Sequence, residues 1–137
     1  MKPFYLKVVA SDKVFFDGMC VSLVIPIDDG SMGILADHEN TVAVIVSGEI
    51  DIKPAEGEEI HGFVGDGFME IIDGEVTVVV LSAEMPEEID AERATEALER
   101  AKEELKHHQT FREHEHSVAS LARATHRLEL IKKYKIK

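Results

Sequence analysis

Four arginines in the last third of the chain have the spacing that most clearly suggests chemistry. They are Arg93, Arg100, Arg123 and Arg127. On α-helices, the first two would lie two turns apart on one face, and the last two one turn apart. Each guanidinium group presents forked donors that match phosphate oxygens, so a group of arginines can bind a polyphosphate. The alternative is that they form ordinary surface ion pairs with the neighbouring Glu92, Glu96 and Glu99.

Histidines form a second group of titratable side chains, between the two pairs of arginines. They are His107, His108, His114 and His116. Imidazole binds Zn²⁺ and titrates near neutral pH, but no cysteine or well-spaced carboxylate completes a closed metal site here. We expect a solvated surface and no metal. His38 and His61 fall in stretches that resemble loops, and we assign them no chemistry of their own.

No group of residues matches a catalytic motif. Asp37, His38 and Glu39 are adjacent, but neighbouring residues point in different directions, and nothing marks a nucleophile that would pair with them. Residues 30–33 are too short for a phosphate-binding loop and lack its Gly-Lys-Ser/Thr ending. We therefore predict a protein with no catalytic residues and no required cofactor.

Composition and charge narrow the class of protein. The 137 residues include one cysteine, Cys20, which we expect to serve packing. No apolar run approaches the roughly 18 residues of a membrane span. Residues 1–89 carry 4 Lys/Arg and 18 Asp/Glu, whereas residues 90–137 carry 11 and 9. The single cysteine and the lack of a long apolar run predict a soluble protein of a reducing cytosol. An acidic body repels nucleic acid, so we expect that the protein does not bind nucleic acid.

The first part of the chain has the pattern of short strands. Apolar and polar residues alternate over 4–9 and 19–27, and 42–46 is a continuous apolar run that favours a strand buried on both faces. Asp17-Gly18 predicts a turn after a short strand at 14–16. Asp73-Gly74 between two β-rich runs predicts a type I′ hairpin, because both residues tolerate positive φ. About eight such strands are typical of an antiparallel sandwich or flattened barrel.

From Asp90 the apolar period becomes helical. Alanines and leucines recur at helical spacing from Ala94 to Leu105 and again from Val118 to Ile131, with Asp90 as a predicted N-cap. The pattern breaks around 107–112, which predicts an αα-hairpin. Both stripes are rich in alanine and bury little surface, so the hairpin is expected to be weakly held and able to open. Antiparallel pairing would bring the four arginines to one side.

The predicted fold is therefore α+β and mostly β. A flattened antiparallel β-sandwich at the N-terminus, residues 1–86, is followed by an antiparallel α-helical hairpin at the C-terminus, residues 87–137. The boundary lies at Met85-Pro86, because the residue before a proline is biased away from the helix.

Three stretches of the chain resemble motifs of one known family. Residues 28–42, DDGSMGILADHENTV, are similar to its Gly-x-x-Gly-Ile-Leu-Pro-Gly-His loop, with Ala36-Asp37 in place of Pro-Gly. Residues 65–84, GDGFMEIIDGEVTVVVLSAE, are similar to its Gly-Gly-Phe strand pair. Residues 89–101, IDAERATEALERA, match its Ile/Leu-Asp-x-x-Arg-Ala motif. Over nearly its whole length, in the same order and spacing, the chain resembles the epsilon subunit of bacterial F-type ATP synthase.

The resemblance implies a non-catalytic subunit of the central stalk. Such a subunit binds the gamma subunit, and its sandwich touches the ring of c subunits, so it would be peripheral to the cytoplasmic side of the cell membrane. Its hairpin lies folded, or extends along gamma into the alpha/beta catalytic head, where it inhibits ATP hydrolysis. In some members, ATP bound to the folded hairpin is a regulatory ligand that favours the folded state.

The resemblance also implies site residues. In the ATP site, Ile89 and Ala94 would pack on the base, Asp90 and Glu84 would accept hydrogen bonds from the nucleotide, and four arginines would hold the phosphates: Arg93, Arg100, Arg123 and Arg127. The loop toward the c-ring would include Ser31, Met32 and His38, with Ser31 standing where many members have an acid.

One other function fits the predicted fold. A stand-alone β-sandwich could be a scaffolding or ligand-binding protein whose hairpin is a dimerisation arm. Copurification with gamma would favour the stalk subunit, and a stable homodimer through residues 90–137 would favour this alternative.

Overall fold

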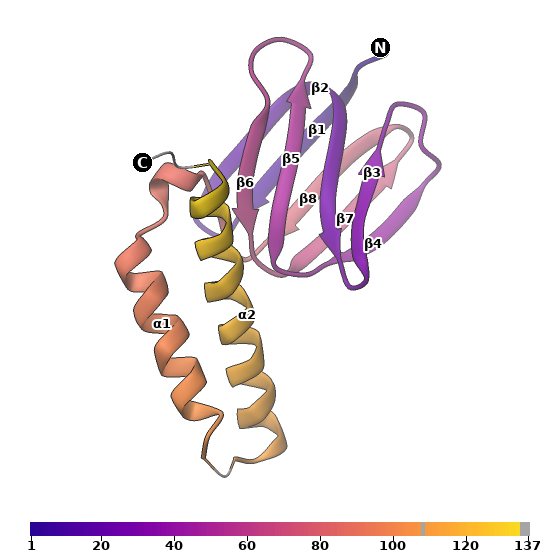
Figure 1. Cartoon of the computed structure of the whole chain (residues 1–137). Coiled ribbons are helices and arrows are strands. Elements are labelled where there is room, and N and C mark those ends of the chain that lie inside the picture. The colour runs from indigo at the N-terminus through magenta and orange to yellow at the C-terminus, as the bar shows by residue number, and fades with distance from the viewer. Residues whose placement is uncertain (108, 135–137) are drawn as a thin grey trace. The chain divides into compact units, whose positions relative to one another are not determined.

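A computed structural model describes residues 1–107 and 109–134. The predicted α+β fold is confirmed: the chain divides into two compact units, Met1–Met85 and Pro86–Lys137 (Figure 1). His108, one of the clustered histidines, and residues 135–137 lie outside the described residues. The first unit consists of strands: β1 Phe4–Ala10, β2 Lys13–Ile27, β3 Gly30–Ile34, β4 Thr41–Ile45, β5 Gly48–Pro54, β6 Ile60–Val64, β7 Gly67–Ile72, β8 Glu75–Val80 and β9 Ala83–Glu84.

The long strand β2 joins the two layers of the sandwich. Its first half, up to Cys20, pairs with β1, and its second half pairs with β3 and β5. The register with β5 shifts between Cys20 and Ser22, where the strand passes from one layer to the other. The strand order is β4-β7-β8-β1-β2-β5-β6-β9, with β3 on β2, and in Figure 1 β5 and β6 lie in front of β1 and β8.

Alternation along the strands builds the core of this unit. In β1 and β8 every second residue is buried, which is the period-2 pattern of a sheet with one face in the core. Cys20 is fully buried, as expected, and burial raises the pKa of its thiol to about 11. Of the described residues that are fully buried, the twelve with the largest side chains are Leu6, Val8, Leu23, Ile25, Ile34, Ile45, Ile50, Ile52, Phe63, Val64, Met69 and Ile71.

Two strand predictions were wrong. Asp17-Gly18 is not a turn, because Asp17 pairs with Lys7 and Gly18 with Leu6 inside the antiparallel ladder of β1 and β2. The chain reverses earlier, at residues 11–12, since glycine permits a turn without requiring one. The apolar run 42–46 is not buried on both faces: Val42 and Val44 are 72% and 71% exposed, because β4 is an end strand with one covered face.

The predicted hairpin at Asp73-Gly74 is confirmed. Both residues have positive φ, 51° and 84°, as a type I′ turn requires, and the turn joins β7 to β8. Gly67 at the start of β7 is required for a different reason. A Cβ atom there would lie 2.0 Å from the carbonyl oxygen of Val79, so no other residue fits.

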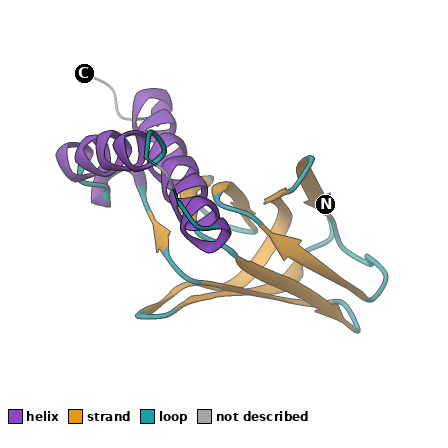
Figure 2. Ribbon diagram, turned by 90° about the horizontal axis from the view of Figure 1, so that it is seen from below, coloured by secondary structure: helices purple, strands orange, loops and turns teal. Residues whose placement is uncertain are grey.

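The second unit is the predicted helical hairpin. A short 3-10 helix, η1 (Pro86–Glu88), precedes α1 (Ala91–Glu104) and α2 (Phe111–Tyr134), which pack against each other (Figure 1, Figure 2). Asp90 is the N-cap of α1, as predicted: its carboxylate accepts a hydrogen bond from the backbone N–H of Arg93. No helix among the described residues is long and apolar enough to cross a membrane.

The division into two units predicts that residues 1–86 fold without the helices. Their core cluster consists of strand residues alone, so removing the hairpin leaves it intact. We expect a fragment of residues 1–86 to give a β-rich circular dichroism spectrum and a cooperative thermal transition. A fragment that is unfolded at 25 °C would mean that the hairpin is part of the core.

Candidate functional site

Small side chains form the contact between α1 and α2. The buried residues are Ala94 and Ala101 on α1, and Ser117, Ala124 and Leu130 on α2. In each helix the small buried residues are seven positions apart, which is two helical turns, so they mark one face. Near the turn, Ser117 Oγ donates to Glu104 Oε1 at 3.2 Å and accepts from Gln109 Nε2 at 3.0 Å. These bonds fix how the two helices are aligned.

The four predicted arginines lie on one flank of this helix pair. Arg93 and Arg100 each precede a buried alanine of α1 by one residue, and Arg123 precedes the buried Ala124 of α2 in the same way. In an antiparallel pair, positions one residue before the contact lie on the same side. Arg127 follows Arg123 by one turn and shares this flank. From the Glu104–Ser117 bond, Arg93 is level with residues 127–128 and Arg100 with residue 121.

Two of the arginines on this flank, Arg93 and Arg100, are open to solvent. Arg123 donates to Ser120 Oγ at 3.2 Å. Among the described residues, no carboxylate lies within ion-pair distance of Arg93, Arg100 or Arg123. For Arg93, Arg100 and Arg123, the alternative expectation of ion pairs with Glu92, Glu96 and Glu99 is not realised among the described residues. Cations gathered on one surface repel one another, so the flank favours an anion.

Of the other residues of the predicted ATP site, Ile89, Asp90 and Ala94 lie at or near the start of α1, and Glu84 belongs to the first unit. Ile89 and Ala94 are only 4% and 5% exposed, so a base could contact no more than their edges. The Asp90 carboxylate is engaged as the helix cap. Glu84 lies on β9, in the first unit, where it pairs with Phe63 of β6.

Of the residues predicted to face the c-ring, Ser31 and Met32 lie on β3 and His38 lies beyond its end. Ser31 is exposed near the β2–β3 turn, and Met32 is half-buried against the core cluster. His38 lies beyond the other end of β3, where its Nδ1 is 2.9 Å from the carbonyl oxygen of Glu39. Asp37, in the position of the family's glycine, has φ 65° and forms an ion pair with Lys2 at 2.8 Å.

An apolar row crosses the outer face of one layer and was not predicted. In the strand register Val44 lies opposite Phe68, Phe68 opposite Val79, Val79 opposite Val9, and Val9 opposite Val14. Val44 is 71% exposed, Val14 54% and Phe68 44%. Exposed apolar residues gathered in this way mark an interaction surface. The sequence signal is the apolar run 42–46, whose pattern predicts a strand buried on both faces.

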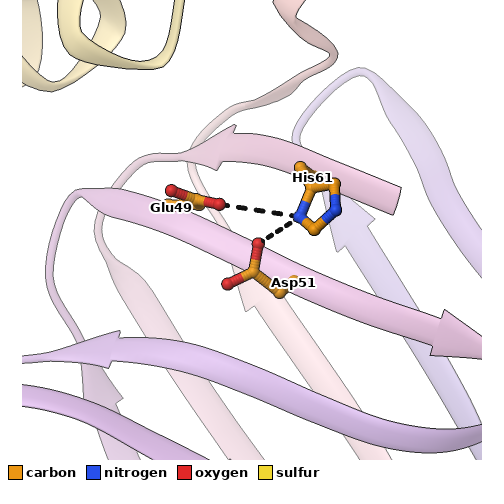
Figure 3. A group of neighbouring side chains, drawn as sticks. All are labelled: Glu49, Asp51 and His61. Carbon is orange, nitrogen blue, oxygen red and sulfur yellow. Dashed lines mark hydrogen bonds and ion pairs between the residues drawn. The ribbon is translucent and has the colours of Figure 1, made fainter. Parts of the chain in front are cut away.

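A group of side chains on β5 and β6 was also missed. His61 Nδ1 lies 2.6 Å from Asp51 Oδ1 and 3.6 Å from Glu49 Oε2, and all three side chains are half-buried (Figure 3). Burial, and next the hydrogen bond with Glu49, raise the pKa of the Asp51 carboxyl to about 6. The sequence around His61 resembles a loop, whereas His61 lies on β6 directly opposite Asp51. The alternation of Glu49 and Asp51 along one strand was the available signal.

Comparison with known proteins gives the family of the chain. Residues 3–86 match the beta-sandwich domain of the ATP synthase delta/epsilon chain, and residues 87–132 match its long alpha-helix domain. The chain belongs to the ATP synthase epsilon chain family. It is 38% identical to the ATP synthase epsilon chain of Ruminiclostridium cellulolyticum over 93% of this chain and 95% of that one. The epsilon chain of Caldanaerobacter subterraneus subsp. tengcongensis is 36% identical, over 97% and 96%.

Solved structures share the fold of this epsilon chain. A chain from the cryo-EM structure of the Tetrahymena thermophila mitochondrial ATP synthase central stalk and c-ring matches with a TM-score of 0.73 at 12% identity, over 93% of this chain and 95% of that one. A chain from the Euglena gracilis mitochondrial ATP synthase matches with a TM-score of 0.70 at 24% identity, over 97% and 79%. The resemblance to bacterial epsilon subunits is thus confirmed.

Proposed function

We propose that this chain is a non-catalytic subunit of the central stalk of an F-type ATP synthase, where it joins gamma to the c-ring and regulates ATP hydrolysis. The observation that carries the proposal is that both domains of the delta/epsilon family match, in order, the two units of the structure. The complex would hold the subunit at the cytoplasmic side of the membrane.

The apolar row from Val44 to Val14 is the surface proposed to dock on gamma. A stalk subunit must transmit torque without slipping, which requires a broad apolar contact surface on a rigid part of the fold. The row crosses five hydrogen-bonded strands, whose other face carries the core, so this part of the fold is rigid. Ser31 and Met32 on β3, and His38 beyond the end of this strand, are proposed to contact the c-ring, with Ser31 the most accessible.

The arginine flank is the surface proposed to hold ATP in the folded hairpin. Arg93, Arg100, Arg123 and Arg127 supply guanidinium donors along about two turns of the helix pair, a length that suits a triphosphate. Asp90 and Glu84 are the proposed acceptors for polar hydrogens of the nucleotide, and Ile89 and Ala94 the proposed contacts of the base. Bound ATP would favour the folded hairpin because the two helices share the phosphates only in that state.

When ATP is absent, the same charges are proposed to favour opening. The buried residues of the two helices are three alanines, a serine and one leucine, Leu130, so the apolar area buried is modest. Repulsion along the arginine flank then opposes a weak attraction. The released α2, which carries Arg123, Arg127, Lys132 and Lys133, would extend along gamma to acidic surfaces of the alpha/beta head and inhibit hydrolysis.

The proposal predicts that ATP binds the isolated chain through its arginines. Calorimetric titration should give heat that saturates at millimolar ATP or below. Arg123→Ala/Arg127→Ala should abolish the heat, since the loss of two charge-assisted hydrogen bonds weakens binding by about 100-fold or more.

The matched control is Lys102→Ala/Lys132→Ala. It removes the same two charges from exposed positions on the opposite flank of the hairpin. This variant should bind ATP like the unaltered chain. If both double variants lost ATP binding equally, the effect would be one of net charge and not of a specific site. If the unaltered chain gave no heat at millimolar ATP, the site would be ruled out.

The proposal also predicts that α2 restrains hydrolysis. Deleting residues 117–137 should raise the ATPase rate of an enzyme reassembled with this subunit, because the inhibitory helix is gone. Gel analysis must first confirm that the shortened chain is incorporated in the same amount. An unchanged rate would leave this chain a coupling subunit without an inhibitory role.

A further inference from the structure

Three side chains on the outer surface of β5 and β6 have no part in the proposed stalk function. We propose that Glu49, Asp51 and His61 bind one divalent transition-metal cation, with Zn²⁺ as the best match (Figure 3). Their ligand atoms, two carboxylate oxygens and one imidazole nitrogen, all lie within 4.8 Å of one another.

The sheet register places these ligands on one rigid surface. Along β5, Gly48, Ile50 and Ile52 are buried, so Glu49 and Asp51 point to the opposite face. Asp51 is the direct cross-strand partner of His61 on β6. Ligands that are fixed by a hydrogen-bonded ladder cost little entropy to organise, in contrast to ligands on a loop.

The distances are close to those of a metal site. Bonds of about 2.0–2.2 Å in tetrahedral geometry place neighbouring ligand atoms about 3.4 Å apart. The separation of His61 Nδ1 from Glu49 Oε2 is 3.6 Å, which already fits. The separation of Nδ1 from Asp51 Oδ1 is 2.6 Å, a hydrogen bond that must open by about 0.8 Å as the metal replaces its proton.

A further carboxylate, that of Glu59, lies beside the second ring nitrogen of His61. Glu59 Oε1 lies 3.4 Å from His61 Nε2, the ring nitrogen that faces away from the other two residues. A histidine that binds a metal usually gives its second N–H to a carboxylate, which fixes the tautomer and directs the free lone pair at the metal. Glu59 is in place for this role, with Nδ1 as the ligand.

The charge of the group also favours a cation. Glu49 and Asp51 are half-buried and close together, and burial raises the pKa of the Asp51 carboxyl, so two negative charges are unfavourable here. A dication in this place would balance both carboxylates at once. Imidazole among the donors favours Zn²⁺ over Mg²⁺ or Ca²⁺, which prefer oxygen donors alone. Three protein ligands leave a coordination position open to water or to a group from another molecule.

The test is titration of Zn²⁺ into the full chain after treatment with chelator, with a chromophoric chelator as competitor. We expect one equivalent to bind more tightly than any other, with no competition from millimolar Mg²⁺. His61→Gln and the isosteric Asp51→Asn should each remove this equivalent, while Glu59→Gln should weaken it by about 10-fold. Circular dichroism would establish that each variant is folded.

The control is His107→Gln/His116→Gln, which removes two exposed histidines at the hairpin turn. It should keep the tight equivalent. The proposal is overturned if the unaltered chain binds no Zn²⁺ at micromolar concentration. It is equally overturned if His61→Gln and Asp51→Asn bind Zn²⁺ like the unaltered chain, or if the tight equivalent is lost only in the control.

Discussion

The pairing of β2 with both layers is the interaction on which the first unit depends. Residues before Cys20 pair with β1, and the strands β8, β7 and β4 follow β1 in the order of the sheet. Residues after Cys20 pair with β3 and β5, and the strands β6 and β9 follow β5 in the order of the sheet. The apolar row lies on one side of this strand order and the Glu49–Asp51–His61 group on the other. Both surfaces are therefore positioned by one 15-residue strand, and a rigid body of this kind suits a part that must transmit torque.

The second unit follows a different physical principle. Apart from Leu130, the buried residues of its helices are small, namely Ala94, Ala101, Ser117 and Ala124, which permit close approach and bury a modest apolar surface. Electrostatic repulsion among the arginines is then large relative to the energy of packing between the helices. A subunit that regulates by opening needs two states of similar free energy, so that a ligand with moderate differential affinity can shift the population. A leucine-rich contact would have held the hairpin closed permanently.

The sequence predicted best where local chemistry decides the conformation. Asp73-Gly74 forms its turn because both residues accept positive φ, and Asp90 caps α1 because its carboxylate reaches the free N–H of Arg93. It predicted poorly where tertiary context decides. Asp17-Gly18 became part of a ladder because β1 lies beside it, and Val42 and Val44 are exposed because no layer covers the outer face of β4. The Glu49–Asp51–His61 group depends on register between two strands, which one sequence does not reveal.

The central claim is that this chain docks on the gamma subunit through the outer face of its sandwich. The most direct measurement is the affinity of gamma for the full chain and for Val44→Asp/Phe68→Asp, which places two charges in the apolar row. The control is Leu35→Asp/Leu81→Asp, which adds the same charges at exposed apolar positions outside the row. We predict that gamma binds the full chain and the control alike, and binds the row variant at least about 100-fold more weakly. Equal binding of gamma by all three, or by none, would contradict the account.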